Sequence, residues 1–168
     1  MKRAWARLGL TGKATVVAGI CILVGLILPW MTWPGGSESL LSGSEMEMLF
    51  KSPELGEDTT ETTVGSAQTL YIAVTTGIVA GAVPLIRKWD GKSAFITLAV
   101  SGIAYFLLTL QMMFLYDGTD RGALVAGERV ASSASAGIGA YIIWAATTVV
   151  GLASLVRVGS ALLARFRS

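Results

Sequence analysis

The chain has 168 residues, of which 53% are hydrophobic and 14% are charged, and its formal net charge is +2. A soluble domain carries about a quarter charged residues, so this composition excludes an ordinary water-soluble domain. The small net charge gives no sign of nucleic-acid binding, and the absence of histidine removes the commonest metal ligand and proton shuttle.

Four apolar stretches account for this composition. Each approaches the roughly 20 residues that a helix needs to cross the ~30 Å hydrocarbon layer, and none contains Asp, Glu, Lys or Arg. We therefore predict an all-α membrane protein, in which four transmembrane helices form one integral membrane domain over residues 1–168. The expected helices cover residues 14–31, 67–86, 94–115 and 136–156, and the expected outer loops cover residues 34–66 and 116–135.

The first apolar stretch follows four basic residues, a feature that a secretory signal peptide would share. Its apolar run is longer than the usual core of a signal, and no clear small-residue cleavage site follows, so we expect a retained helix. A cleaved signal is the alternative. Pro29 and Pro84 are expected near helix ends, where the missing backbone N–H is tolerated. The tail "RVGSALLARFRS" is expected to continue the fourth helix.

In the first outer loop, Glu45, Met46, Glu47 and Met48 alternate in polarity, which favours a short strand within a short β-hairpin. The segment "SPELGEDTTETT" is acidic, and we interpret it as a solvated surface. Cation binding is the alternative, although the spacing matches no calcium-binding loop.

Charged residues are distributed unequally over the expected loops. The N-terminal segment, the loop between the second and third helices, and the tail together hold ten lysines and arginines and one acid. The two other loops hold three lysines and arginines and ten acids. The positive-inside rule then predicts a multi-pass protein of the plasma membrane with both termini in the cytoplasm, and the basic residues are expected to contact anionic lipid heads.

Aromatic residues occur at the expected interfaces between lipid and water, where Trp and Tyr rings anchor membrane proteins. The predicted anchors are Trp5, Trp30, Trp33, Trp89 and Tyr116. Trp144 lies within the fourth helix, and we expect a packing role for it.

Small residues four apart allow two helices to approach closely, and they occur at Gly77 and Gly81 and again at Thr147 and Gly151. Packing within the chain is the favoured interpretation, and an oligomer contact is the alternative. The two helices also share residues at a constant offset of 70, such as Tyr71 and Tyr141. This similarity indicates a duplicated helical hairpin, with chance identity between apolar helices as the alternative.

The segments "GICILVGLILPWMTW", "GSAQTLYIAVTTGIVAGAV" and "GIGAYIIWAATTVVGLASL" carry a resemblance to a known group. The chain is similar to small four-helix membrane proteins of haloarchaea and actinobacteria, which have Leu-Pro-Trp at the end of helix one and Gly-x-Gly-x-Tyr at the start of helix four. This resemblance implies a fold and no specific activity. The topology also resembles that of claudins, but Cys21 is the only cysteine and the claudin cysteine pair is missing.

No catalytic constellation, cofactor motif or metal-ligand pattern occurs in the sequence, so we expect no enzymatic activity, no cofactor and no bound metal. The expected function is that of a subunit or scaffold in a membrane assembly, which acts through its helices and its acidic outer loop. The expected partners are the lipid bilayer and a protein or a second copy of the chain. The alternative is a small channel or transporter component that forms a pore only on oligomerisation, along faces that carry Thr76, Thr147 and Gln111.

Overall fold

A computed structural model describes residues 2–41, 46–51, 60–116, 123–125, 128–131 and 135–166. Most of these residues are helical. The helices are α1 (Lys2–Arg7), α2 (Leu10–Gly25), α3 (Ser66–Ile86), α4 (Gly91–Tyr116) and α5 (Ile138–Phe166). The strands are β1 (Pro29–Trp33), β2 (Gly36–Ser39), β3 (Met46–Lys51), β4 (Thr60–Gly65), β5 (Ala123–Val125), β6 (Glu128–Ala131) and β7 (Ser135–Ala136).

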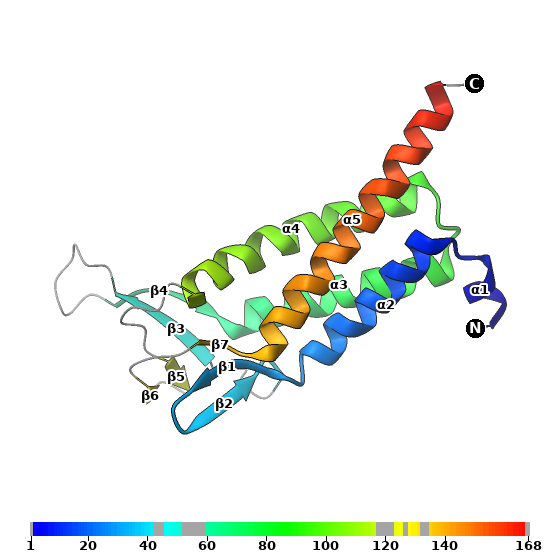
Figure 1. The fold of residues 1–168 in the computed structure, drawn as a ribbon. Helices are drawn as coiled ribbons and strands as arrows, with labels where there is room; N and C mark the ends of the chain where they lie inside the picture. The colour runs from blue at the N-terminus through cyan, green and yellow to red at the C-terminus, as the bar shows by residue number, and fades with distance from the viewer. Residues whose placement is uncertain are drawn as a thin grey trace.

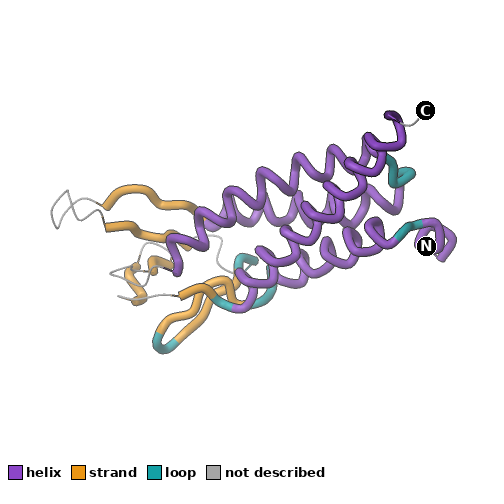
Figure 2. Tube along the Cα trace, turned by 45° about the horizontal axis from the view of Figure 1, so that its top comes forward, coloured by secondary structure: helices purple, strands orange, loops and turns teal. Residues whose placement is uncertain are grey.

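Helices α2 to α5 run in alternating directions and pack side by side (Figure 1). Helix α5 lies against both α2 and α4, and α3 contacts both of the same helices. Figure 2 shows the strands gathered at one end of the helices and the two chain termini at the other end. We call these the sheet end (β1–β7) and the terminal end (α1, the first turns of α2 and α4, residues 87–90 and the C-terminal part of α5).

Three of the described helices are long and apolar enough to cross a membrane: Gln68–Ile86, Gly91–Leu110 and Ile138–Phe166. The predictions of a mostly helical chain and of membrane-compatible helices are therefore confirmed for these three segments. Helix α5 continues through the tail to Phe166, as expected, while α1 was not predicted. The remaining apolar helix, α2, has 16 residues and a length of about 24 Å, which is less than a bilayer's hydrocarbon thickness.

Helix α2 ends at Gly25, whereas the sequence predicted that the first apolar helix continues through Met31. Proline explains the difference, because a proline ring clashes with the carbonyl four residues earlier, and for Pro29 that carbonyl belongs to Gly25. The residue before a proline also disfavours the helical conformation. The chain leaves the helix through tight turns, in which Ile27 N donates to Val24 O and Leu28 N donates to Gly25 O. Pro84, in contrast, lies in the last turn of α3 as predicted.

The segment after α2 becomes β1, the central strand of a three-stranded antiparallel sheet in the order β2-β1-β7. Gly35 connects β1 to β2 with a φ of 98°, a conformation that glycine adopts freely and that a Pro-Gly type II turn requires. A second sheet has the order β4-β3-β5-β6 and joins the regions between α2 and α3 and between α4 and α5. The predicted strand around Met46 and the predicted hairpin are confirmed, but the all-α prediction understated the strand content.

Backbone contacts fix the position of α5 against the end of α2. A Cβ atom added at Gly139 would lie 2.6 Å from Leu28 O and 2.7 Å from Gly25 O, and one added at Gly137 would collide with Pro29 O. The Gly137 amide donates to Trp30 O at 2.8 Å. The Leu-Pro-Trp segment and the Gly-x-Gly-x-Tyr segment, which lie far apart in the sequence, therefore pack against each other.

Helix α2 approaches α3 equally closely through Gly19. A Cβ atom there would lie 2.6 Å from Gly81 N and 2.9 Å from Gly77 O. Around these contacts the core contains small and branched side chains, among them Ile22, Ala73 and Val150, all fully buried. Small residues on α2 thus let it pack at backbone distance against two neighbours.

The duplicated-hairpin hypothesis compares α3 with α5 at the offset of 70. The buried residues Ala73, Ala80 and Pro84 in α3 correspond to the buried residues Ile143, Val150 and Ser154 in α5. Tyr71 and Tyr141 are both exposed. The two helices therefore face the core at equivalent positions, an arrangement that a duplication would produce and that helix periodicity alone also produces.

We predict that Gly139→Ala lowers the free energy of unfolding by about 1–3 kcal/mol, because the new methyl group meets backbone oxygens that cannot rotate away. The measurement is thermal and chemical unfolding of the purified protein in mild detergent. Gly102→Ala is the matched control, since nothing lies within 4 Å of a Cβ atom at this exposed helical position. Equal stability of the two variants would contradict the packing assignment.

Candidate functional site

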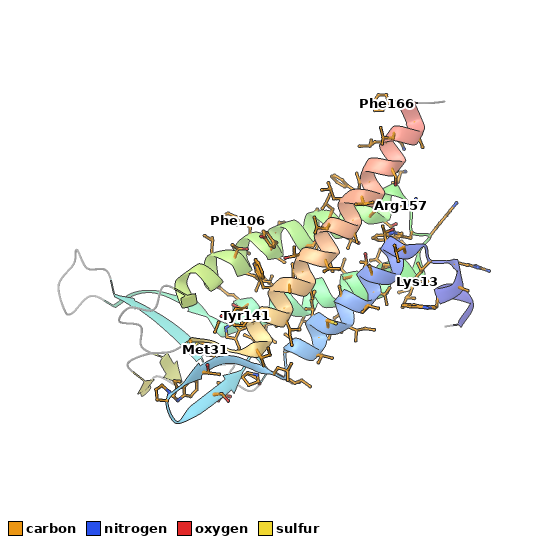
Figure 3. The ribbon with its side chains drawn as sticks, viewed as in Figure 1. Lys13, Met31, Phe106, Tyr141, Arg157 and Phe166 are labelled. Carbon is orange, nitrogen blue, oxygen red and sulfur yellow. The ribbon has the colours of Figure 1, made fainter. Side chains whose placement is uncertain are left out.

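The charged side chains of α2 to α5 all lie at the terminal end. They are Lys13 in α2, Lys92 in α4, and Arg157 and Arg165 in α5, and α3 has none. Figure 3 shows Lys13 and Arg157 near the N-terminus and Met31 at the opposite end beside the strands. The exposed Arg87 and Lys88 follow α3 at the same end. The terminal end is therefore the basic face of the described molecule.

Trp89 joins three parts of the chain at this face. Its indole N–H donates to Thr11 Oγ1 at 3.1 Å, and its backbone carbonyl accepts a hydrogen bond from Arg157 Nε at 3.0 Å. The ring is only 7% exposed and packs with Leu8, Val16 and Ala94. Trp89 is thus a core residue that fastens the α3–α4 connection to α2 and α5, in place of the predicted role as an interfacial anchor.

Asp90 caps the N-terminus of α4. Its carboxylate Oδ1 accepts hydrogen bonds from the Ser93 N–H at 2.9 Å and from the Ser93 hydroxyl at 3.0 Å, and its own N–H donates to Ser93 Oγ. This is the reciprocal arrangement that satisfies free amide groups at a helix start. The backbone hydrogen bond from Ser93, followed by that from its side chain, lowers the pKa of Asp90.

A groove of about 610 Å³ lies between the start of α4 and the C-terminal part of α5. Its polar lining comes from Asp90, Lys92 and Arg165, and its apolar lining includes Phe95, Ile96 and Leu162. The floor is close-packed, because a Cβ atom at Gly91 would lie 2.8 Å from the Cβ atom of Ala161. The groove combines cations with an exposed apolar wall.

The buried polar side chains of the helices carry hydroxyl groups. Thr76 Oγ1 donates to Ile72 O at 2.8 Å, and Thr147 Oγ1 donates to Ile143 O at 2.8 Å. These bonds to the preceding turn satisfy the hydroxyls within their own helices. Ser154 Oγ is buried and has no hydrogen-bond partner among the described residues. Thr76 and Thr147 therefore face the inside of the single chain, and the side chain of Gln111 lies outside the described residues.

The four other predicted anchors differ in their environments. Trp5 is partly exposed, and Lys13 Nζ lies 5.9 Å from the centroid of its ring, a cation–π geometry. Trp30 is only 1% exposed in the core at the sheet end, so it packs inside the protein where the sequence predicted an interfacial anchor. Trp33 is half-buried, and Tyr116 is the last residue of α4 with its side chain outside the described residues. Burial of Trp30 follows from the early end of α2, after which this segment forms β1 and packs against α5.

The predicted packing residues have separate partners. Gly77 and Gly81 of α3 contact Gly19 of α2. The small-residue pair of α3 therefore makes a packing contact within the chain. Thr147 is buried in the core, and a Cβ atom at Gly151 would lie 3.7 Å from Ser101 Oγ of α4. Trp144 packs as expected: its ring stacks on Tyr105 at 6.0 Å, and its N–H donates to Thr109 Oγ1.

Sequence reasoning missed the partners of these residues. Gly19 and Gly25 make backbone-distance contacts and were not singled out, and Gly139 was noted only within the Gly-x-Gly-x-Tyr motif, without a packing role. Their signal was present as small residues within apolar runs, but their facing partners depend on which helices are neighbours. The acidic segment with Glu54, Glu57 and Asp58 lies outside the described residues. Among the described residues, no three His, Cys, Asp or Glu side chains gather as a metal site.

Comparisons of this chain with protein-family models, with curated proteins and with solved structures found no match.

We predict that the Asp90 cap stabilises the protein in a pH-dependent way. Because the folded pKa is lowered, the ionised cap contributes its full stability above the unfolded pKa of about 3.9, and this contribution disappears as the pH falls through the lower folded pKa. Melting temperatures in detergent should show a difference between wild type and Asp90→Asn that is constant above about pH 5 and shrinks as the pH falls below about 4. Asp90→Ala, which removes the cap entirely, should be the less stable variant throughout. A wild-type-minus-Asn difference that does not change with pH would contradict the assignment.

Proposed function

We propose that this chain is a non-enzymatic integral membrane protein that acts as a subunit or scaffold of a membrane assembly. The observation that carries the proposal is the joining of β3 to β5, through which the two regions between helices form one sheet at one end of the molecule. Apolar helices that end in a folded sheet suit a protein that presents a surface to a partner. Strands β4 and β6 form the edges of this sheet, and β2 and β7 form the edges of the other.

In this proposal all four apolar helices lie in the plasma membrane as one bundle. The short α2 is compatible with that arrangement because the chain beyond it keeps its backbone hydrogen-bonded, with Leu41 N donating to Leu26 O and β1 paired on both sides. The exposed side chains along the helices are large and apolar, among them Ile20, Ile78 and Phe106. We also propose that the chain is related to the small four-helix prokaryotic membrane proteins that its sequence resembles.

The proposed orientation has the terminal end and both termini in the cytoplasm. It is supported by the basic side chains of that end, which the positive-inside rule assigns to the cytoplasmic side, and by the acidic composition of residues 34–66. The absence of charged groups from the middle of the helices supports a scaffold over a proton relay or an ion-coupled transporter, which place such groups at depth.

The absence of histidine from the sequence supports a non-enzymatic role, since a nucleophile would lack its usual base. The alternative of a pore formed on oligomerisation required the faces of Thr76 and Thr147 to meet between chains. Both hydroxyls are buried and bonded to their own helices, so these residues lend that alternative no support.

The orientation predicts which sites a membrane-impermeant maleimide reaches. In a Cys21→Ala background, Ser37→Cys in the β1–β2 hairpin should be labelled on intact cells. Lys88→Cys between α3 and α4 should be labelled only after the cells are permeabilised. Both positions are exposed, so burial does not explain a difference between them. The opposite pattern, or labelling of both positions on intact cells, would contradict the proposed topology.

The assembly role predicts that the full chain, isolated from native membranes in mild detergent, carries a stoichiometric protein partner or a second copy. Neutralising the acidic segment with Glu54→Gln, Glu57→Gln and Asp58→Asn should reduce partner recovery several-fold, because complementary charge speeds and orients association. Arg87→Gln with Lys88→Gln, at the opposite end, is the control and should leave recovery unchanged. A monomer without any co-purifying protein would count against the proposal.

A further inference from the structure

We propose that the groove between the start of α4 and the C-terminal part of α5 binds one anionic phospholipid. The phosphate of the headgroup would contact Lys92 and Arg165, and an acyl chain would lie along Phe95 and Ile96. This inference rests on the proposed membrane location, but it does not depend on the proposed role in an assembly.

The shape of the groove follows from a single close contact. Gly91 has no side chain, and α5 approaches it so that Ala161 would lie 2.8 Å from a Cβ atom at that position. Helix α5 then continues past the start of α4 (Figure 1). The open space of about 610 Å³ flanks this crossing point, within the range of sites that hold small molecules.

The charges in the groove favour an anion. Lys92 and Arg165 both line it, and an arginine guanidinium and a lysine ammonium are the usual partners of phosphate. Asp90 is the acid among the lining residues, and its carboxylate already accepts two hydrogen bonds from Ser93. The groove is thus lined by two cationic side chains, Lys92 and Arg165, and by one carboxylate, which caps α4.

The apolar wall favours a lipid over a small soluble anion. Phe95, Ile96 and Leu162 are 61%, 48% and 50% exposed, and they line the same groove as Lys92 and Arg165. A phosphate ion needs no such surface, whereas a phospholipid has a charged head joined directly to apolar chains.

The surroundings of the groove carry the same sign of charge. Lys13, Arg87, Lys88 and Arg157 belong to the same end of the molecule. Basic residues near a membrane surface attract anionic lipids and raise their local concentration. The basic residues of the terminal end thus attract anionic lipids to this end of the molecule, and Lys92 and Arg165 in the groove contact the headgroup.

The test uses the full chain in a neutral detergent and counts bound lipids by native mass spectrometry, with melting temperature as a second readout. The probes are phosphatidylglycerol, phosphatidylcholine, inorganic phosphate and glycerol phosphate. We expect one phosphatidylglycerol to be retained and to raise the melting temperature, with much weaker retention of phosphatidylcholine and no effect of the two water-soluble anions at equal concentration.

Two matched double variants separate the groove from general attraction. Lys92→Gln with Arg165→Gln should weaken phosphatidylglycerol retention at least tenfold. Arg87→Gln with Lys88→Gln removes the same charge from exposed positions outside the groove and should weaken it less than threefold. A third variant, Phe95→Ser with Leu162→Ser, should weaken retention of the lipid. All four side chains of the two charge variants are exposed, so lipid-free melting temperatures should match wild type and confirm folding.

Three outcomes would overturn the inference. Equal losses in the two charge variants would show attraction to the whole basic face without a defined site. Equal stabilisation by phosphate and by phosphatidylglycerol would identify a soluble anion as the ligand. A dimer that dissociates in the Lys92 and Arg165 variant would show that a second copy of the chain occupies the groove. Failure of the maleimide-labelling prediction would instead remove the membrane location on which the inference rests.

Discussion

The contact between the end of α2 and the start of α5 is a backbone-to-backbone contact, and the rest of the fold depends on it. Gly139 lies where any side chain would meet the carbonyl oxygens of Leu28 and Gly25, and the Gly137 amide bonds to Trp30 O. Side chains at the contact usually keep two helix axes 8–10 Å apart, and glycine lets the two backbones approach more closely. Helix α5 also packs against α4. The contact of α2 with α5 therefore positions α4 as well.

Pro29 has a larger effect than a local helix end. By stopping α2 at Gly25, it leaves an apolar segment that must satisfy its backbone outside a helix. The segment does so as β1, between β2 and β7, and Trp30 and Met31 consequently fill the core where the sheet meets the helices. The aromatic residues of this segment therefore stabilise the junction between the helices and the sheet.

The two ends of the molecule differ in chemistry in a way that suits different partners. The terminal end combines basic residues with a groove and with the hydrogen-bonded Trp89, which together suit contact with anionic headgroups. The sheet end combines strands from both interhelical regions and so suits contact with a protein. Between them, the described helices bury hydroxyl groups that are mostly bonded within their own helix, which suits a stable spacer between the two surfaces.

Apolar stretches and charge distribution were sufficient to predict helices α3, α4 and α5, because hydrophobic length and the absence of charge are local properties of the chain. The strand around Met46 was also predictable from its alternation. The tertiary structure decided the burial of Trp30 and Trp89, the groove beside Gly91, and the contact between residues 28–29 and 137–139. These features depend on which segments become neighbours, and a sequence of small and apolar residues is compatible with many pairings. Only the packed chain selects one, because close packing at glycine positions leaves space for a single partner at each contact.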